Sequence, residues 1–127
     1  MDTDPIAPAA PSAGPETVAV IDIGASAVRL VVAELAAGRR PFVVEEVVRG
    51  VSLGKDTFSA GRIGSGAMEA ALRALEGFKH LMDEHGASRY RAVATSAVRE
   101  AANADTFLDR VQVRVGLRVD VIDVSEE

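Results

Sequence analysis

The sequence predicts an α/β domain with a mixed five-stranded sheet, built in the order β-β-β-α-β-α-β. Apolar residues make up 48% of the 127 residues and aromatic residues only 4%, so aliphatic side chains must fill the core. This composition suits a sheet covered by helices better than an aromatic-rich β-sandwich. Short apolar runs also alternate with longer segments of helical periodicity. The first three runs are joined by short loops and the later ones by helical segments, which indicates a meander followed by crossovers.

A Pro-rich segment opens the chain. Four of the five prolines lie within residues 1–16, among Ala, Ser and Asp. Such a composition buries too little apolar surface to offset the entropy lost on ordering. We therefore expect residues 1–16 to be a disordered leader and the domain to occupy residues 17–127.

The first three strands are expected at residues 18–23, 28–35 and 42–48. The first is an apolar run of the kind found in a central strand that is buried on both faces. Small residues at 24–27 form a tight turn to the second strand, and a short loop leads to the third. Residues 51–61 form a longer connection without regular structure.

A long helix is expected over residues 64–85 and ends at Gly86. Its apolar side chains recur at helical spacing and form one face: Met68, Ala71, Leu72, Leu75, Phe78 and Met82. The polar side chains between them lie on the opposite face, so this helix covers the sheet.

The rest of the chain alternates strands and short helices. A fourth strand at residues 90–95 leads to a helical turn capped by Ser96. A second helix over residues 104–115 is expected to be capped by Asn103. The fifth strand follows at residues 117–123, and the crossovers make the last strands parallel to the first.

Charge and composition exclude several classes of function. The net charge of −5 gives no general electrostatic footprint for nucleic acid. The absence of cysteine excludes disulfides and cysteine metal sites. No apolar run approaches the roughly 20 residues that span a bilayer, and the N-terminus lacks the features of a signal peptide. We expect a cytoplasmic protein with neither nucleic acid nor a membrane as a partner.

Ligand sites in such sheets lie beyond the carboxyl ends of the strands. At the first of these ends, Asp22 stands within an apolar strand and is followed by the small residues Gly24, Ala25, Ser26 and Ala27. Backbone N–H groups of such a turn can approach a phosphate closely. The alternative is a tight hairpin whose Asp caps a turn.

Two further strand ends carry polar residues. Thr95, Ser96 and Arg99 place two hydroxyls and a guanidinium at a helix start, which makes an anion site. The alternative is an ordinary N-cap with a surface Arg paired to a carboxylate. After the fifth strand, Glu126 and Glu127 offer carboxylates for a general base or a metal, or else form a frayed acidic terminus.

Together these segments resemble the exopolyphosphatase / guanosine pentaphosphate phosphohydrolase (Ppx/GppA) family of the actin-like ATPase superfamily. The most specific stretch is residues 91–103, which contains Thr95-Ser96-Ala97-Val98-Arg99-Glu100. Asp22-Ile23-Gly24 and Leu53-Gly54 match as well. The third family motif, Ser-Gly-x-Glu-Glu-Ala, has a catalytic second Glu, which falls at Glu127.

The resemblance implies a ribonuclease-H-like domain that is truncated at its C-terminal end. The missing C-terminal portion of the protein is then expected to be a partner of this domain. It implies metal-assisted hydrolysis of a terminal phosphoryl group of inorganic polyphosphate or guanosine pentaphosphate. Asp22 would bind Mg²⁺ and Glu127 would take the proton of the attacking water. The phosphate-binding residues would be Gly24, Ala25, Ser26, Ala27, Thr95, Ser96 and Arg99. A homodimer is possible, and the sequence does not decide the oligomeric state.

Two departures from the family pattern bear on activity. The family has Ser-Asn-Ser where this chain has Ala25-Ser26-Ala27, and Ser-Gly-x where it has Asp123-Val124-Ser125. They support an alternative function, a non-catalytic regulatory module that binds polyphosphate or a nucleotide. A sugar-kinase-like ATPase shares Asp22-Ile23-Gly24 but does not explain residues 95–103. Because a second glycine-rich loop and a second domain are missing, we expect the chain alone to be inactive.

Overall fold

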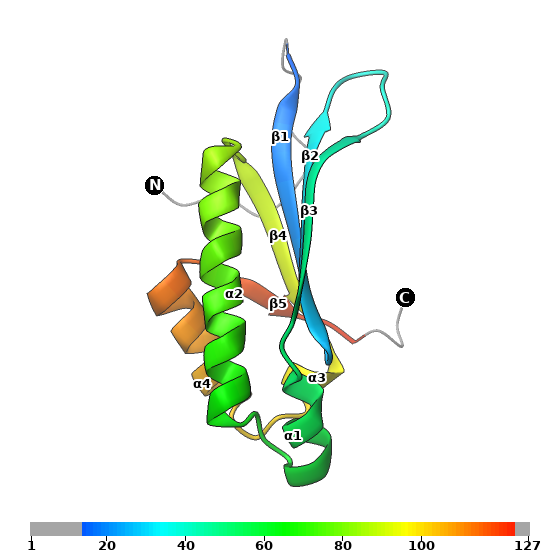
Figure 1. Ribbon diagram of the computed structural model, residues 1–127. Helices are drawn as coiled ribbons and strands as arrows, with labels where there is room; N and C mark the ends of the chain where they lie inside the picture. Colours follow the sequence, from blue (N-terminus) through cyan, green and yellow to red (C-terminus); the bar gives the residue numbers. More distant parts are fainter. Residues whose placement is uncertain (1–13, 124–127) are drawn as a thin grey trace.

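The computed structural model describes residues 14–123 (Figure 1). They contain one sheet in the order β3-β2-β1-β4-β5. β1 pairs antiparallel with β2 and parallel with β4, β2 pairs antiparallel with β3, and β4 pairs parallel with β5. The strands are β1 (Glu16–Ile23), β2 (Ala27–Leu35), β3 (Phe42–Gly50), β4 (Arg89–Ala94) and β5 (Val119–Val121). The predicted α/β class with a mixed five-stranded sheet is confirmed.

The central strand β1 has one buried and one open face. Ala19, Ile21 and Ile23 are fully buried against the helices, which lie on one side of the sheet (Figure 1). On the other face Val20 is 43% exposed and Asp22 is exposed. The expectation that this strand is buried on both faces is therefore wrong for the described residues, because their helices cover a single face.

β1 also starts earlier than expected. Glu16, which the sequence analysis assigned to the leader, is the first residue of β1. Its carboxylate accepts a 2.6 Å hydrogen bond from Arg89 Nη2 at the start of the neighbouring β4. This side-chain bond links the start of β1 to the start of β4. Residues 1–13 lie outside the described residues, so their disorder stays a prediction.

The connection after β3 contains a helix that the sequence analysis missed, α1 (Leu53–Ala60). Leu53 and Thr57 are buried on its inner side. Gly61 ends the helix in the left-handed region, with φ +79°, and its N–H donates to Thr57 O. Packing under the end of the sheet stabilises this segment, since Gly54, Thr57 and Ser59 are poor helix formers.

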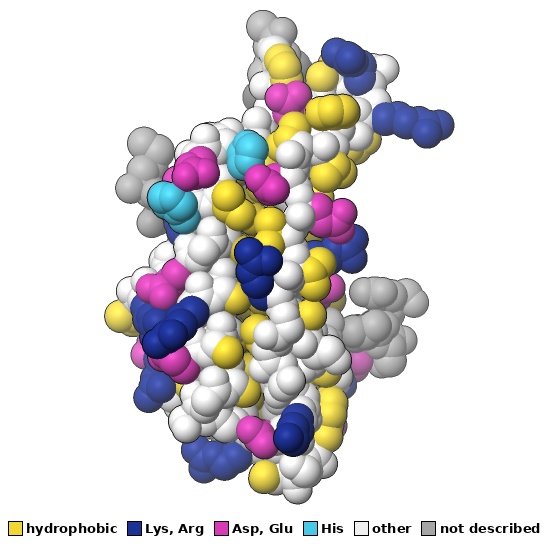
Figure 2. Space-filling view, in the orientation of Figure 1, with side chains coloured by type: hydrophobic (Ala, Val, Ile, Leu, Met, Phe, Trp, Pro, Cys, Tyr) yellow, Lys and Arg dark blue, Asp and Glu magenta, His cyan; other side chains and the backbone are white. Residues whose placement is uncertain are grey.

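The long helix α2 (Ser65–Glu84) agrees closely with its prediction. All six residues of the expected apolar face are buried in the core: Met68, Ala71, Leu72, Leu75, Phe78 and Met82. Gly86 follows with φ +68°, the conformation that a glycine terminator needs. The outer surface of the helix carries charges of both signs, interspersed without a large patch of one sign (Figure 2). Among the described residues, no helix has the length and apolar character that a membrane crossing requires.

The second crossover consists of α3 (Ser96–Arg99), α4 (Ala104–Arg110) and the π-helical turn η1 (Val111–Val115), which ends at Gly116. Asn103 does not cap α4 with its side chain. Its amide instead pairs with the backbone of Ile63, accepting a 2.8 Å bond from Ile63 N and donating a 2.9 Å bond to Ile63 O. The predicted cap is therefore wrong, and Asn103 joins the two crossovers.

Candidate functional site

The turn between β1 and β2 is held by its own backbone and by α1. Gly24 N donates to Ala27 O at 3.0 Å, so the N–H of Gly24 is used inside the turn. The carbonyl of Ala25 accepts a 2.9 Å bond from Gly54 N, and that of Ser26 accepts a 2.9 Å bond from Val51 N. In the described part of the chain, the N–H groups of Ala25 and Ser26 have no hydrogen-bond partner. The turn therefore offers two backbone donors.

Gly54 allows α1 to lie directly on this turn. A Cβ atom added at Gly54 would be 2.7 Å from Ala25 Cβ and 2.9 Å from Phe58 Cε2. Real Cβ atoms do not approach other atoms so closely, so only glycine fits between the helix and the turn. The Leu53-Gly54 pair was noticed in the sequence, but its role in fixing the turn depends on a helix that was not foreseen.

The end of β4 lies beside this turn. Thr95 N donates to Ile23 O at 3.3 Å, which ties the residue after β4 to the last residue of β1. Val98 N and Arg99 N both donate to Thr95 O. Among the described residues, neither the N–H groups of Ser96 and Ala97 nor the hydroxyls of Thr95 and Ser96 have partners. A second set of donors thus begins next to the first.

The side chain of Arg99 contacts the segment that follows β5. Its Nη1 atom lies 2.7 Å from Oδ1 of Asp123, and both side chains are 39% exposed. Ile122 N donates to Ala94 O at 2.9 Å, which holds the segment after β5 against the end of β4. The structure therefore contains the ion pair that was the structural alternative for Arg99. Sequence reasoning missed Asp123 as a partner because the two residues come from different elements.

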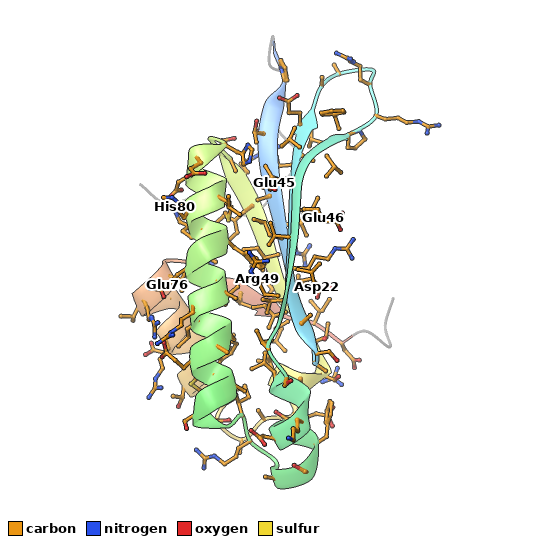
Figure 3. All side chains as sticks on the ribbon, in the orientation of Figure 1. Asp22, Glu45, Glu46, Arg49, Glu76 and His80 are labelled. Carbon is orange, nitrogen blue, oxygen red and sulfur yellow. The ribbon has the colours of Figure 1, made fainter. Side chains whose placement is uncertain are left out.

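Asp22 lies on the open face of the sheet. Its cross-strand neighbours are Arg29 on β2 and Val93 on β4. Arg29 pairs with Glu46 at 2.7 Å, and Figure 3 shows Asp22 and Glu46 on the side of the sheet that faces away from α2. Within residues 14–123, no group of three or more His, Cys, Asp or Glu side chains is arranged to hold a metal ion. Asp22 is exposed on this face, and Glu127 lies outside the described residues.

A shifted pKa is found on the helical side of the molecule. Arg114 donates hydrogen bonds of 2.8 and 2.7 Å to Glu69, and Arg73 donates a third at 3.1 Å. The bonds from Arg114 and then Arg73 lower the pKa of Glu69 to about 2. Because this cluster joins η1 to α2, its role is structural.

Comparison with known proteins identifies relatives along most of the chain. Residues 31–127 match the model of the Ppx/GppA phosphatase family. The chain is 31% identical over 108 residues to exopolyphosphatase 1 of Mycobacterium leprae, covering 85% of this chain and 32% of that protein. It is 29% identical over 127 residues to the guanosine-5'-triphosphate,3'-diphosphate pyrophosphatase of Photobacterium profundum, covering 100% and 24%. The chain therefore spans about a third or less of the length of these relatives.

The fold has a close match among solved structures. The crystal structure of the Ppx/GppA family member from Aquifex aeolicus superimposes with a TM-score of 0.85 at 39% identity. The match covers 89% of this chain and 37% of that one. It confirms the predicted ribonuclease-H-like fold class.

Proposed function

The chain belongs to the Ppx/GppA phosphatase family, and on this premise we propose that it forms one wall of a site that hydrolyses a terminal phosphoryl group. The substrates are inorganic polyphosphate or guanosine pentaphosphate, since the similar proteins include an exopolyphosphatase and a guanosine-5'-triphosphate,3'-diphosphate pyrophosphatase. A cytoplasmic location is part of this proposal.

The observation that carries the proposal is the meeting of two donor sets at the ends of β1 and β4. Ala25 and Ser26 supply backbone N–H groups from one turn, and Ser96 and Ala97 supply them from the next. The 3.3 Å bond from Thr95 N to Ile23 O holds the two sets together. Donors fixed before the ligand arrives stabilise the charge of a phosphoryl group in transfer, because they need no reorganisation.

Side chains add to these backbone donors. The hydroxyls of Thr95 and Ser96 can donate to phosphate oxygens, and the Arg99 guanidinium can donate two parallel bonds. Arg99 must first leave Asp123, from which it is 2.7 Å away. Both side chains are 39% exposed, so this exposed pair costs about 0.2–1 kcal/mol to break, less than a charged phosphate contact returns.

The remaining chemistry is the activation of water. Glu127, in the position of the family's catalytic carboxylate, takes the proton of the attacking water. Asp22 contributes one carboxylate to Mg²⁺, which commonly binds through one or two carboxylates together with substrate phosphates. When bound, the ion supplies neutralisation of phosphate charge. The exposed position of Asp22 leaves its carboxylate accessible to such an ion.

A second candidate function is a non-catalytic module that binds polyphosphate or a nucleotide. The ion pair between Arg99 and Asp123 favours it, because a carboxylate competes with phosphate for the cation of the site. Such a module retains the backbone donors of Ala25 and Ser26 and therefore still binds phosphate. The two candidates differ in phosphate release, not in binding.

The test measures binding of inorganic tripolyphosphate to the chain by calorimetry. Phosphate release in the presence of Mg²⁺ is measured on a family-length protein that carries this domain, since the chain spans about a third or less of the length of its relatives. Arg99→Ala should weaken binding about 10- to 100-fold, the usual effect of losing a charge-assisted hydrogen bond. Arg99→Lys should recover only part of the loss, because an ammonium cannot form the bidentate fork. Arg39→Ala, at the exposed loop between β2 and β3, is the matched control and should leave binding unchanged.

Each outcome has a clear meaning. Binding by the chain with phosphate release by the family-length protein supports the hydrolase, and binding without release by the family-length protein supports the regulatory module. Equal affinity of wild type and Arg99→Ala, with a loss of stability in the variant, assigns Arg99 a purely structural role. Absence of tripolyphosphate binding rejects both candidates.

A further inference from the structure

An exposed aromatic ring stands beside the proposed phosphate-binding turn. Phe58 on α1 is 58% exposed, although large apolar side chains are normally buried. The start of α1 is bonded to the turn through Gly54 N and Ala25 O, at 2.9 Å. The ring therefore has a fixed relation to the residues that offer phosphate donors.

The absence of a side chain at Gly54 brings the ring to this position. A Cβ atom there would meet Phe58 Cε2 at 2.9 Å on one side and Ala25 Cβ at 2.7 Å on the other. The edge of the ring consequently rests on the backbone of Gly54, immediately next to Ala25. Its contact with Gly54 fixes the edge of the ring, and more than half of its surface is available to a ligand.

Phe58 lines a cleft of about 490 Å³ beside the turn between β1 and β2. The turn contributes Ala25 and Ser26 to its lining, and α1 and the residue before it contribute Ser52, Lys55, Phe58 and Ser59. Among the described residues, the exposed Lys55 ammonium has no ion-pair partner. The cleft thus combines a cation, hydroxyls and one aromatic face, and its volume lies in the range of small-ligand pockets.

We propose that this cleft binds the nucleoside part of a nucleoside polyphosphate, with the base stacked on Phe58 and Lys55 beside the phosphate chain. The inference rests on the proposed function, because the terminal phosphates are placed at the turn formed by Ala25 and Ser26. A base has a planar π face that gains from stacking on an exposed ring, whereas an inorganic phosphate chain has none. Phe58 is therefore a specificity-determining residue that favours nucleotides over inorganic polyphosphate.

The test compares two probes with the same number of phosphates, GTP and inorganic tripolyphosphate, by calorimetry on the full chain. Wild type should bind GTP more tightly. Phe58→Ala should weaken GTP binding about 5- to 100-fold, the range for losing one aromatic partner of a stacked base, and leave tripolyphosphate affinity within about twofold. Phe58→Tyr keeps the ring and should bind GTP as wild type does. Phe42→Ala is the matched control, since Phe42 is 66% exposed and pairs with Glu34, at the end of the β2–β3 ladder away from the turn.

Three results would overturn the inference. If GTP binds no more tightly than tripolyphosphate, the guanosine makes no contact and only the proposed phosphate site survives. If Phe58→Ala weakens both probes equally, the ring supports the turn and does not recognise a base. If neither probe binds, the proposed function fails together with the inference. Circular dichroism of each variant shows that the comparison is made between folded proteins.

Discussion

In the proposed site Asp123 would compete with phosphate for Arg99, and removing the charge of Asp123 tests this proposal. Asn has nearly the same shape as Asp, so Asp123→Asn removes the charge with little change in packing. Arg99 Nη1 lies 2.7 Å from Asp123 Oδ1, with both side chains 39% exposed. Pairs with this exposure contribute about 0.2–1 kcal/mol. The variant should therefore lose at most about 1 kcal/mol of stability, measured by urea unfolding.

The free energy of the ion pair between Arg99 and Asp123 also determines how much ligand binding should tighten in the variant. A phosphate no longer has to break this pair, so the substitution should tighten tripolyphosphate binding about 1.4- to 5-fold. Loss of a negative charge beside a polyanion acts in the same direction and is screened by salt, with a Debye length of about 10 Å at 0.1 M. Both contributions fall with salt, because an exposed ion pair is screened as well, so an Arg99→Ala background separates them better than ionic strength does.

A matched control removes the same charge nearby. Asp120 on β5 is exposed and lies 3.9 Å from Arg91, so Asp120→Asn changes the net charge without freeing Arg99. It should tighten binding less than Asp123→Asn does. In an Arg99→Ala background, Asp123→Asn should lose the part of its gain that depends on Arg99. Weaker binding by Asp123→Asn would refute the reasoning, since it would mean that Asp123 orients Arg99 for the ligand.

Two further predictions concern the fold around the site. Asn103→Ala removes both bonds to the backbone of Ile63, at 2.8 and 2.9 Å, and leaves two partly buried groups unpaired; urea unfolding should show a loss of about 1–3 kcal/mol. For Glu69, the bonds from Arg114 and Arg73 lower the pKa from 4.5 to about 2, so their stabilisation is present above pH 4.5 and lost as the pH falls towards 2. Glu69→Gln should therefore show a smaller loss of stability than wild type between pH 4.5 and 2, and an equal loss would contradict this assignment.

Elements with a strong periodic pattern could be predicted from the sequence. The six apolar residues of α2 recur at helical spacing, and all six are buried as expected. The strands β1 and β2 were predicted from short apolar runs, although the expected burial of β1 on both faces was wrong. α1 was missed because Gly54, Thr57 and Ser59 give it a weak local preference for helix. Its formation depends on burial of Leu53 and on bonds to the turn after β1, which no local pattern reveals.

The candidate site was predictable in its location but not in its internal contacts. Thr95 and the turn at Ala25 and Ser26 were expected at the carboxyl ends of strands, and the bond from Thr95 N to Ile23 O places the two ends together. The pairing of Asn103 with Ile63 joins residues 40 apart in the sequence, and it replaced the local cap that the sequence favoured. Contacts of this kind depend on the tertiary arrangement, which single-sequence patterns do not contain.

The two departures from the family pattern have unequal consequences for the site. In the first turn, Ala25 and Ala27 stand where the family has serines. The donors of this turn are backbone N–H groups, which do not depend on the identity of the side chain. At the end of β5, a family Ser is replaced by Asp123, which introduces a negative charge in contact with Arg99. Phosphate binding depends on net local charge. We therefore expect the second departure to change phosphate binding more than the first, and Asp123→Asn is the variant that tests this expectation.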